Sequence, residues 1–262
     1  MSVFQDYANF YDLLYREKDY AGEQKYIRQL IQAEMEQPTR LLDLGCGTGS
    51  HAMCFAEDGL QVVGIDYSDN MIAIAQGKRA QAPVWLSDRL VFQQGDARKV
   101  RLGKKFDVVV SLFHVASYQV QDADVLKFFK TANAHCQSDG VFIFDCWFGP
   151  AVVTDPPVNK TRTIPTENGH LLRRTEVSMD IQAHTVKVDF TLEQYTGEKK
   201  QPGVIKEQHL MRYFFTEELE QLLNQAGMQI RHIYRWMSQD PASEASWFVV
   251  IVAQPLNSHS CN

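Results

Sequence analysis

The chain has 262 residues, of which 45% are hydrophobic and 22% are charged, so it can bury the core of one α/β domain with an insertion. Its formal net charge is −6, whereas nucleic-acid-binding proteins usually carry an excess of basic residues, so we expect no nucleic-acid partner. No apolar run approaches the roughly 18 to 20 residues of a membrane helix, and the charged N-terminal segment does not resemble a secretory signal, so no membrane partner is expected.

The first half of the chain alternates between apolar runs and helical periodicity. Asp19 is placed to cap a helix that stops before Pro38, and Gly59 and Gly140 are placed to end later elements. Alternation of this kind is typical of a doubly wound sheet with parallel strands. The pattern predicts strands at 40–44, 61–65, 90–94, 106–113 and 141–147, and helices at 50–58, from 68 onward and at 124–136.

The helical period disappears between residues 148 and 212. Three β-rich runs, at 170–180, 184–196 and 203–214, are separated by turn residues, which predicts an antiparallel insertion after the fifth strand. Thr216 is then placed to cap a helix that ends at Gly227. Residues 228–237 and 247–253 predict two last strands, which would complete the sheet as a hairpin.

A glycine-rich segment, DLGCGTG, joins the first predicted strand to the next helix and contains Asp43, Gly45, Gly47 and Gly49. Glycines at this position allow a tight turn and a close approach of the backbone to a nucleotide-like ligand. A dinucleotide fingerprint would place its third glycine at position 50, where this chain has Ser50. The Asp43 carboxylate would repel a pyrophosphate and attract the ammonium group of a methionine, which favours an adenosylmethionine site over an NAD site.

Two further acidic residues follow the next two predicted strands. Asp66 lies 21 residues after Gly45, where a carboxylate can accept hydrogen bonds from both ribose hydroxyls. The third strand ends in Gly95, Asp96 and Ala97, so Asp96 can accept from an adenine amino group while the Ala97 N–H donates to the ring. Carboxylates at the carboxyl ends of three successive strands predict a ligand at that edge of the sheet.

Together, the segments LLDLGCGTG, GIDYS, QGDAR and FDVVVSLF resemble the class I S-adenosylmethionine-dependent methyltransferases over about residues 40 to 147. The resemblance implies an α/β, Rossmann-like, doubly wound fold with a seven-stranded mixed sheet, and S-adenosyl-L-methionine as the cofactor. It places Asp66 at the ribose, Asp96 at the adenine, and Asp43 with the glycines at the methionine end. It also implies a pocket lined by Leu112, Phe113 and His114, with Tyr67 and Met71 beside the adenine.

The flanking segments resemble bacterial methyltransferases that dimethylate amines of nucleotide-linked aminosugars, and glycine N-methyltransferase-like enzymes share part of this layout. The resemblance implies that N-terminal tyrosines close over the cofactor. We therefore assign Tyr11 and Tyr15 to the cofactor and Tyr7 and Tyr20 to the acceptor; the alternative is that these tyrosines form the apolar face of a docking helix. The aminosugar enzymes tend to have a histidine a few residues past the fourth strand, where this chain has Tyr118.

The resulting layout has four parts: an N-terminal lid and helix (1–38), a cofactor-binding core (39–147), an antiparallel β insertion on the acceptor side (148–212), and the C-terminal part of the core sheet (213–262). Methyl transfer is an in-line displacement that depends mainly on alignment and exclusion of water. His114 is the first candidate for a general base and Tyr118 the second. Trp147 and Arg212 are candidate acceptor contacts, although Arg212 also fits an interstrand salt bridge.

Several functions remain open alongside methylation of a small molecule such as the amine of a nucleotide-linked sugar. The alternatives are an O-methyltransferase, a nucleic-acid methyltransferase of the same fold, and a non-catalytic protein that binds adenosylmethionine or a nucleotide. A nucleic-acid adenine methyltransferase would place Asp-Pro-Pro-aromatic after the fourth strand, but here Asp155-Pro156-Pro157-Val158 follows the fifth strand and lacks the aromatic residue. We therefore interpret these prolines as stiffening a loop.

The cysteines and histidines predict neither disulfides nor a metal site. The cysteines are odd in number and form no CxxC pair, and the histidines show no metal-ligand spacing. This cysteine pattern is typical of reduced thiols, so we expect a cytoplasmic protein, and the spacing predicts no metal. We also expect a monomer or homodimer. The cysteines are Cys46, Cys54, Cys136, Cys146 and Cys261.

Overall fold

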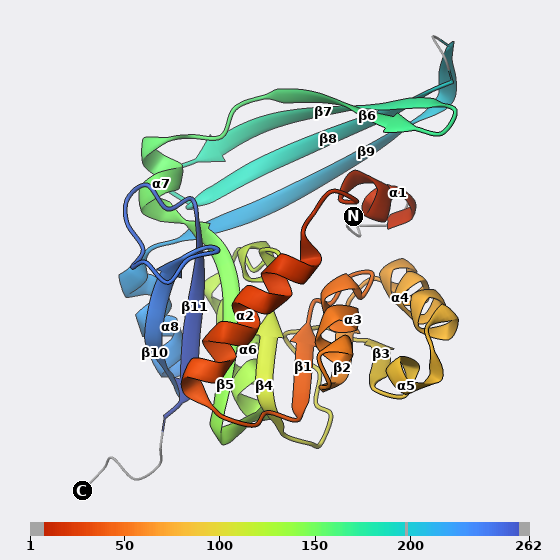
Figure 1. The fold of residues 1–262 in the computed structure, drawn as a ribbon. Helices are drawn as coiled ribbons and strands as arrows, with labels where there is room; N and C mark the ends of the chain where they lie inside the picture. The colour runs from red at the N-terminus through yellow and green to blue at the C-terminus, as the bar shows by residue number, and fades with distance from the viewer. Residues whose placement is uncertain (1–7, 197–198, 257–262) are drawn as a thin grey trace, which may run out of the picture.

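The computed structural model describes residues 8–196 and 199–256, so Tyr7 and Cys261 lie outside the described residues (Figure 1). A sheet with the order β3-β2-β1-β4-β5 forms the centre of the core, and all four of its strand pairs are parallel. Its strands are β1 (Arg40–Leu44), β2 (Gln61–Asp66), β3 (Leu90–Gln94), β4 (Phe106–Ser111) and β5 (Cys136–Phe148).

Two antiparallel strands complete this sheet beyond β5. Strand β11 (Phe248–Pro255) pairs with β5, and β10 (Met228–Arg235) pairs with β11. With the five parallel strands they make up the seven predicted core strands, but β9 also pairs with β5, so the sheet continues into the lobe and has eleven strands where seven were predicted. The fold class inferred from the sequence is otherwise confirmed, including the closing hairpin.

Helices cover both faces of the core sheet (Figure 1). One face packs against α6 (Asp122–His135) and α8 (Thr216–Gln225), and the other packs against α2 (Tyr20–Glu34), α3 (Ser50–Glu57), α4 (Asp69–Gln81) and the short α5 (Val84–Ser87). The central strands are therefore buried on both sides, which explains why β4 and β5 are apolar almost throughout.

The insertion forms a four-stranded antiparallel lobe that arches over the carboxyl ends of the core strands (Figure 1). Its strands are β6 (Lys160–Thr166), β7 (Gly169–Asp180), β8 (Thr185–Thr196) and β9 (Lys199–Phe214). The lobe joins the core where Trp147 and Phe148 of β5 pair with Tyr213 and Phe214 of β9. The α1 helix (Ala8–Leu14) lies between the lobe and the core.

The sequence predictions for the insertion and its exit were wrong in three details. A helix, α7 (Gly149–Thr154), and the edge strand β6 were missed, because α7 is only six residues long and β6 is mostly exposed and lacks an apolar alternation. The helix after β9 begins at Thr216, so Phe215 and not Thr216 holds the N-cap position. Glu218 supplies the cap instead, since its Oε2 accepts the Phe215 N–H at 3.3 Å.

Candidate functional site

A cavity of about 1230 Å³ lies between the carboxyl ends of the core strands and the inner face of the lobe. The glycine-rich loop and the ends of β2, β3 and β4 line its inner part, and residues of β6, β7, β8 and β9 line its outer part. It is bordered by η1 (Val115–Tyr118) and by the loop containing Asp155, Pro156 and Pro157. One cavity thus connects the predicted cofactor edge with the predicted acceptor lobe.

The glycines of the loop serve different purposes. Gly45 and Gly47 line the cavity, and a Cβ on Gly47 would have no neighbour within 4 Å, so the Gly47 backbone is open to a ligand. Gly49 does not line the cavity: it has φ +80° at the start of α3, and a Cβ there would lie 2.7 Å from the ring of Phe92. The structure therefore gives Gly49 a packing role, in place of the predicted ligand contact.

Asp66 lies in the cavity wall at the end of β2. Its Oδ2 accepts the Gly47 N–H at 2.8 Å and its Oδ1 accepts the Ser68 N–H at 2.9 Å, so the carboxylate holds the glycine loop to the start of α4. Burial raises the pKa of Asp66 although these N–H groups act in the opposite direction. The Tyr67 N–H also bonds to this carboxylate, which still has capacity to accept a further donor from a ligand hydroxyl.

Asp43 is buried on β1 with an exposed fraction of 2%, below the glycine loop, and it does not line the cavity. Burial and the nearby charge of Asp66 raise the pKa of Asp43 to about 8. The sequence prediction of a direct contact with an ammonium group therefore stays a prediction. With its pKa raised to about 8, Asp43 is mostly protonated at pH 7, and a nearby cation would favour the ionised form.

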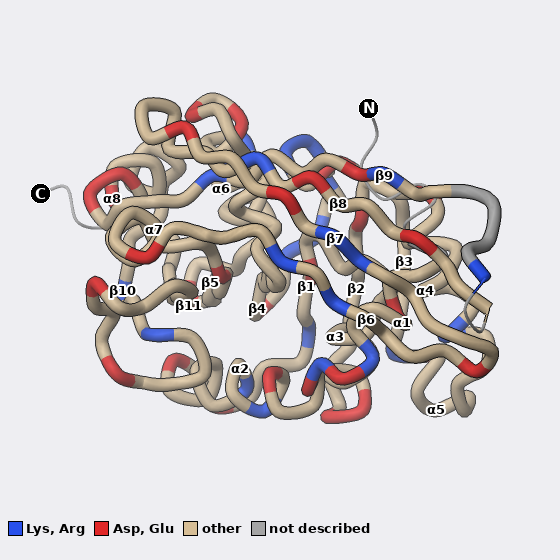
Figure 2. Tube along the Cα trace, turned by 90° about the horizontal axis from the view of Figure 1, so that it is seen from above, with Lys and Arg blue, Asp and Glu red and all other residues tan. Residues whose placement is uncertain are grey.

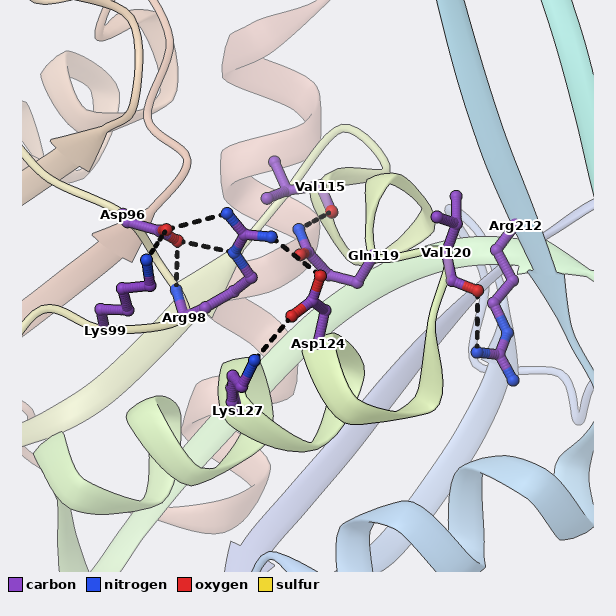
Figure 3. Close-up of polar contacts among 9 residues, drawn as sticks. All are labelled: Asp96, Arg98, Lys99, Val115, Gln119, Val120, Asp124, Lys127 and Arg212. Carbon is purple, nitrogen blue, oxygen red and sulfur yellow. Dashed lines mark hydrogen bonds and ion pairs between the residues drawn. The ribbon is translucent and has the colours of Figure 1, made fainter.

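Asp96 lines the cavity and is held by Arg98 (Figure 3). Its Oδ1 accepts from the Arg98 N–H and Nε, and its Oδ2 accepts from Nη2, each at 2.9 Å. Although burial acts in the opposite direction, these bonds lower the pKa of Asp96. Arg98 also donates to Asp124 at 2.9 Å, so the end of β3 is tied to the first turn of α6. Asp96 Oδ2 accepts one hydrogen bond and lies 3.8 Å from Lys99 Nζ, so it can accept one further donor.

Other residues predicted to bind the cofactor also line the cavity. Tyr11 and Tyr15 reach it from α1 and its C-terminal end, with their ring centroids 4.8 Å apart, and Tyr15 lies 5.0 Å from the ring of Phe113. The remaining members of this set are Tyr67, Met71, Gly95, Ala97 and Leu112.

Polar contacts hold α1 against the glycine loop. Asp12 Oδ1 accepts from the Thr48 hydroxyl at 2.7 Å, and Asp12 Oδ2 lies 2.8 Å from Lys78 Nζ on α4. Tyr20, which we had assigned to the acceptor, packs against the ring of His51 instead and does not line the cavity. The α1 segment thus covers the cavity, while Tyr20 belongs to the base of α2.

His114 lines the cavity, and Asp145 fixes its position. His114 and Phe113 have φ of 66° and 68°, in the left-handed region that non-glycine residues rarely adopt. This turn directs the His114 N–H to both oxygens of Asp145, at 3.0 and 3.1 Å, and brings Nδ1 within 2.7 Å of Oδ2. The imidazole also stacks on Phe248, with centroids 4.6 Å apart. A buried carboxylate therefore orients this histidine.

Tyr118, at the end of η1, meets a second histidine across the cavity. Its Oη lies 2.7 Å from Nδ1 of His209 on β9, and Nε2 of His209 lies 3.2 Å from Oε2 of Glu207. Tyr118 and His209 both line the cavity. Burial raises the pKa of Tyr118 well above its ordinary value, so its hydroxyl stays protonated at neutral pH.

Of the two predicted acceptor contacts in the C-terminal half of the described chain, Trp147 lines the cavity and Arg212 does not. The Arg212 side chain is 7% exposed, pairs with Glu218 and Asp122, and donates to the Val120 carbonyl at 3.3 Å (Figure 3). The prediction that Arg212 contacts the acceptor is wrong, because ion pairs hold its guanidinium between β9, α8 and the start of α6. The alternative of an interstrand salt bridge is correct in that Arg212 forms ion pairs, but its partners Asp122 and Glu218 lie on helices.

Basic side chains of the lobe also line the cavity. Lys160 and Arg162 lie on β6 and Arg173 on β7, and Figure 2 shows basic positions along both strands. Arg162 and Arg173 are directly opposite each other in the antiparallel pair. None of the three forms an ion pair with a carboxylate in the described part of the chain. Like charges placed opposite each other destabilise a sheet, so this wall is suited to an anionic ligand.

The sequence reasoning missed several residues that the structure brings to the site: Asp145, Lys160, Arg162, Arg173 and His209. Asp145 had a readable signal, because it is a lone acid in the otherwise apolar run VFIFDCW. The lobe residues had none, since alternating polar residues in an antiparallel strand do not reveal which face is covered.

The described residues contain no group of three or more His, Cys, Asp or Glu side chains arranged to hold a metal ion. None of the helices described is both long and apolar enough to span a membrane.

Comparisons with known proteins agree with this geometry. Residues 41–140 match the family described as "Methyltransferase domain". The chain is 28% identical to the dTDP-3-amino-3,4,6-trideoxy-alpha-D-glucopyranose N,N-dimethyltransferase of Streptomyces venezuelae, over 87% of this chain and 92% of that protein. It is 26% identical to the dTDP-4-amino-2,3,4,6-tetradeoxy-D-glucose N,N-dimethyltransferase of Saccharopolyspora spinosa, over 87% of each. The fold is similar to that of an S-adenosylmethionine-dependent methyltransferase from Clostridium acetobutylicum (TM-score 0.79, 21% identity, 96% of this chain and 98% of that one).

Proposed function

Because this chain is a class I S-adenosylmethionine-dependent methyltransferase, we propose that it transfers methyl groups to the amine of a nucleotide-linked sugar. The observation that carries the proposal is the basic wall of the cavity. Lys160, Arg162 and Arg173 would bind the diphosphate of such a substrate, and its sugar would then extend toward His114 and Tyr118. The two relatives from Streptomyces and Saccharopolyspora are named for substrates of this class.

The cofactor, S-adenosyl-L-methionine, supplies a sulfonium-bound methyl group that is activated for displacement. The residues around the inner part of the cavity fit it: Asp66 would accept from the ribose hydroxyls and Asp96 Oδ2 from the adenine amino group, while the open backbone of Gly47 would lie against the methionine portion. Tyr11 and Tyr15 on the lid segment would exclude water from the reacting end. In this arrangement the protein contributes alignment and desolvation.

A substrate panel tests this proposal. We expect methylation of dTDP-3-amino-3,4,6-trideoxy-α-D-glucopyranose, detected as adenosylhomocysteine and as a mass increase of the sugar, and at least tenfold lower kcat/KM for the same amino sugar without its nucleotide. Arg162→Gln should raise KM for the dTDP-sugar and leave kcat nearly constant. Lys187→Gln, on β8 and outside the cavity lining, is the matched control. Equal rates with and without the nucleotide would refute the assignment of the basic wall.

A hydroxyl acceptor is a second candidate, favoured by the contact between His114 and Asp145. An amine needs only to be neutral before it attacks, whereas a hydroxyl must lose a proton, and a histidine oriented by a buried carboxylate is suited to accept it. If the substrate is a hydroxyl, His114→Ala should reduce turnover roughly 100-fold without changing the affinity for adenosylhomocysteine. Activity that survives within a few fold would restrict His114 to lining the pocket.

We further propose that the enzyme acts in the cytoplasm, as a monomer or homodimer. All four cysteines in the described residues are free, and burial raises the pKa of Cys46, Cys54, Cys136 and Cys146. Thiols with raised pKa values are poor nucleophiles and persist in a reducing compartment. Size-exclusion chromatography with light scattering would determine the oligomeric state.

A further inference from the structure

Three polar side chains form a line from the cavity into the lobe. Tyr118 Oη is 2.7 Å from His209 Nδ1, and His209 Nε2 is 3.2 Å from Glu207 Oε2. Tyr118 lies at the end of η1 in the core, whereas Glu207 and His209 lie on β9. Because Glu207 and His209 are two positions apart on one strand, their side chains point to the same face of the lobe. The side chains of His209 and Glu207 are 4% and 9% exposed, so the line is shielded from solvent except at the cavity.

Aromatic and charged side chains of the lobe surround His209. Phe190 on β8 packs edge-on against the imidazole, with centroids 4.9 Å apart, and the guanidinium of Arg173 on β7 lies over the Phe190 ring, 4.1 Å from its centroid. The charged and titratable groups near this line are therefore Glu207, Arg173 and Tyr118 itself, with Tyr15 and Asp66 farther along the cavity. Glu207 lies beside the imidazole, where a carboxylate would stabilise a positive charge that forms on the ring during the reaction.

We propose that Tyr118, His209 and Glu207 are a proton relay that removes the ammonium proton of the methyl acceptor. The inference rests on the proposed function in that the acceptor is an amine, which is protonated in water at neutral pH. The acceptor ammonium passes a proton to Tyr118 Oη as the tyrosine hydroxyl proton moves to His209 Nδ1. Glu207, whose Oε2 lies 3.2 Å from Nε2, would stabilise the positive charge of the resulting imidazolium.

The proton and electron balance of the step is simple. The neutral amine uses its lone pair to form the new N–C bond, the S–C bond breaks, and its electron pair stays on sulfur. Tyr118 ends the step with a hydroxyl, as it began, and His209 holds the extra proton until water takes it. Tyr118 is the catalytic residue, since it touches the acceptor, and His209 and Glu207 act through it as positioning residues.

The alternative is that the Tyr118–His209 contact only fastens η1 to the lobe, and a pH profile separates the two roles. With the relay intact, turnover of dTDP-3-amino-3,4,6-trideoxy-α-D-glucopyranose should be level above neutral pH. In His209→Asn, turnover at pH 7 should fall about 100-fold and then recover about tenfold per pH unit toward the pKa of the acceptor ammonium. Tyr118→Phe should behave in the same way. His170→Asn, in the same lobe but stacked on Tyr195 outside the cavity lining, should keep the wild-type profile.

Two kinetic results would overturn the relay. One is a His209→Asn rate that is reduced by the same factor at every pH, which is what a loosened η1 would give. The other is a profile that shifts in His114→Gln and not in His209→Asn, which would assign the proton to His114. In every variant, the melting temperature with adenosylhomocysteine shows whether the cofactor site is still intact.

If no nucleotide sugar is a substrate, the proposed acceptor is refuted but the relay is not. A spectroscopic measurement tests the relay without a substrate. Nitrogen-15 NMR of the adenosylhomocysteine complex, with His209 assigned by difference from His209→Asn, should show a neutral imidazole protonated on Nε2 near pH 8. Tyr118→Phe should shift the Nδ1 resonance. A proton on Nδ1 throughout pH 6 to 9 would refute the relay.

Discussion

Replacing Asp43 with asparagine separates the stability of this protein from its ability to bind the cofactor. Asp43 is 2% exposed, and burial together with the charge of Asp66 raises its pKa from the ordinary 3.8 to about 8. Between about pH 4 and pH 8 the folded protein therefore keeps a proton on Asp43 that the unfolded chain releases. The free energy of unfolding falls as pH rises through this range. At pH 7 the free energy of unfolding is therefore lowered by up to about 4 kcal/mol. This value follows because pH 7 lies 3.2 units above the ordinary pKa of 3.8 and each unit corresponds to about 1.36 kcal/mol.

An asparagine at this position has the same shape as the aspartic acid and does not titrate, so it stays neutral in both the folded and the unfolded chain. Asp43→Asn should therefore raise the free energy of unfolding of the ligand-free protein by up to about 4 kcal/mol at pH 7. The gain should shrink by about 1.4 kcal/mol per pH unit as pH is lowered toward 4. Urea denaturation at pH 5, 6, 7 and 8, followed by tryptophan fluorescence, measures it. A variant that is less stable than wild type at pH 7, or a difference that does not depend on pH, would refute the reasoning.

The same substitution tests the proposed role of Asp43 at the methionine end of the cofactor. If the cofactor ammonium ionises Asp43, binding releases a proton, and the affinity of wild type for adenosylhomocysteine should rise with pH up to about 8. Asp43→Asn should bind weakly and lose this pH dependence in titration calorimetry. Wild-type affinity in the variant would place Asp43 outside the binding function.

Three further predictions concern residues around the site. Arg212→Ala should lower the free energy of unfolding by about 3 kcal/mol, because it leaves Glu218 half-buried without its partner, and should not change KM for the sugar substrate. Asp12→Ala should weaken adenosylhomocysteine binding about threefold in calorimetry, since the exposed contacts that hold α1 are worth less than about 1 kcal/mol. Because Gly47 and Gly49 both have positive φ, either alanine variant should be less stable than wild type, but Gly49→Ala should lower the melting temperature more, since its Cβ would also lie 2.7 Å from Phe92. Gly47→Ala should lose more cofactor affinity than Gly49→Ala; the reverse order of either effect would contradict the two roles.

The core and the position of its ligand edge could be predicted from the sequence because their signals are local. Apolar runs and glycine stops identified the parallel strands, and β3 has the predicted bounds, 90–94. Asp66 and the glycine loop are readable because a strand, a tight turn and a helix follow one another directly in the chain. Each of these residues reaches the cavity through its own element, without help from distant segments.

The chemistry of the acceptor side was decided by tertiary structure. Tyr118 and His209 are 91 positions apart, and they meet only because Trp147 and Tyr213 pair and set the lobe over the core. The position of Arg212 also depends on contacts between distant segments. Its partners on α6 and α8 hold the guanidinium away from the cavity. Neither outcome has a local signal.

The physical reason lies in the two-residue period of a strand. Alternation in β6 to β9 shows that each strand has two faces, but a shift of one residue in register would exchange them, and both faces of this lobe carry charged and apolar side chains. The sequence by itself therefore determined the fold and the cofactor. The pairing of β5 with β9, which sets the lobe over the core, determined which arginines and which histidine line the cavity.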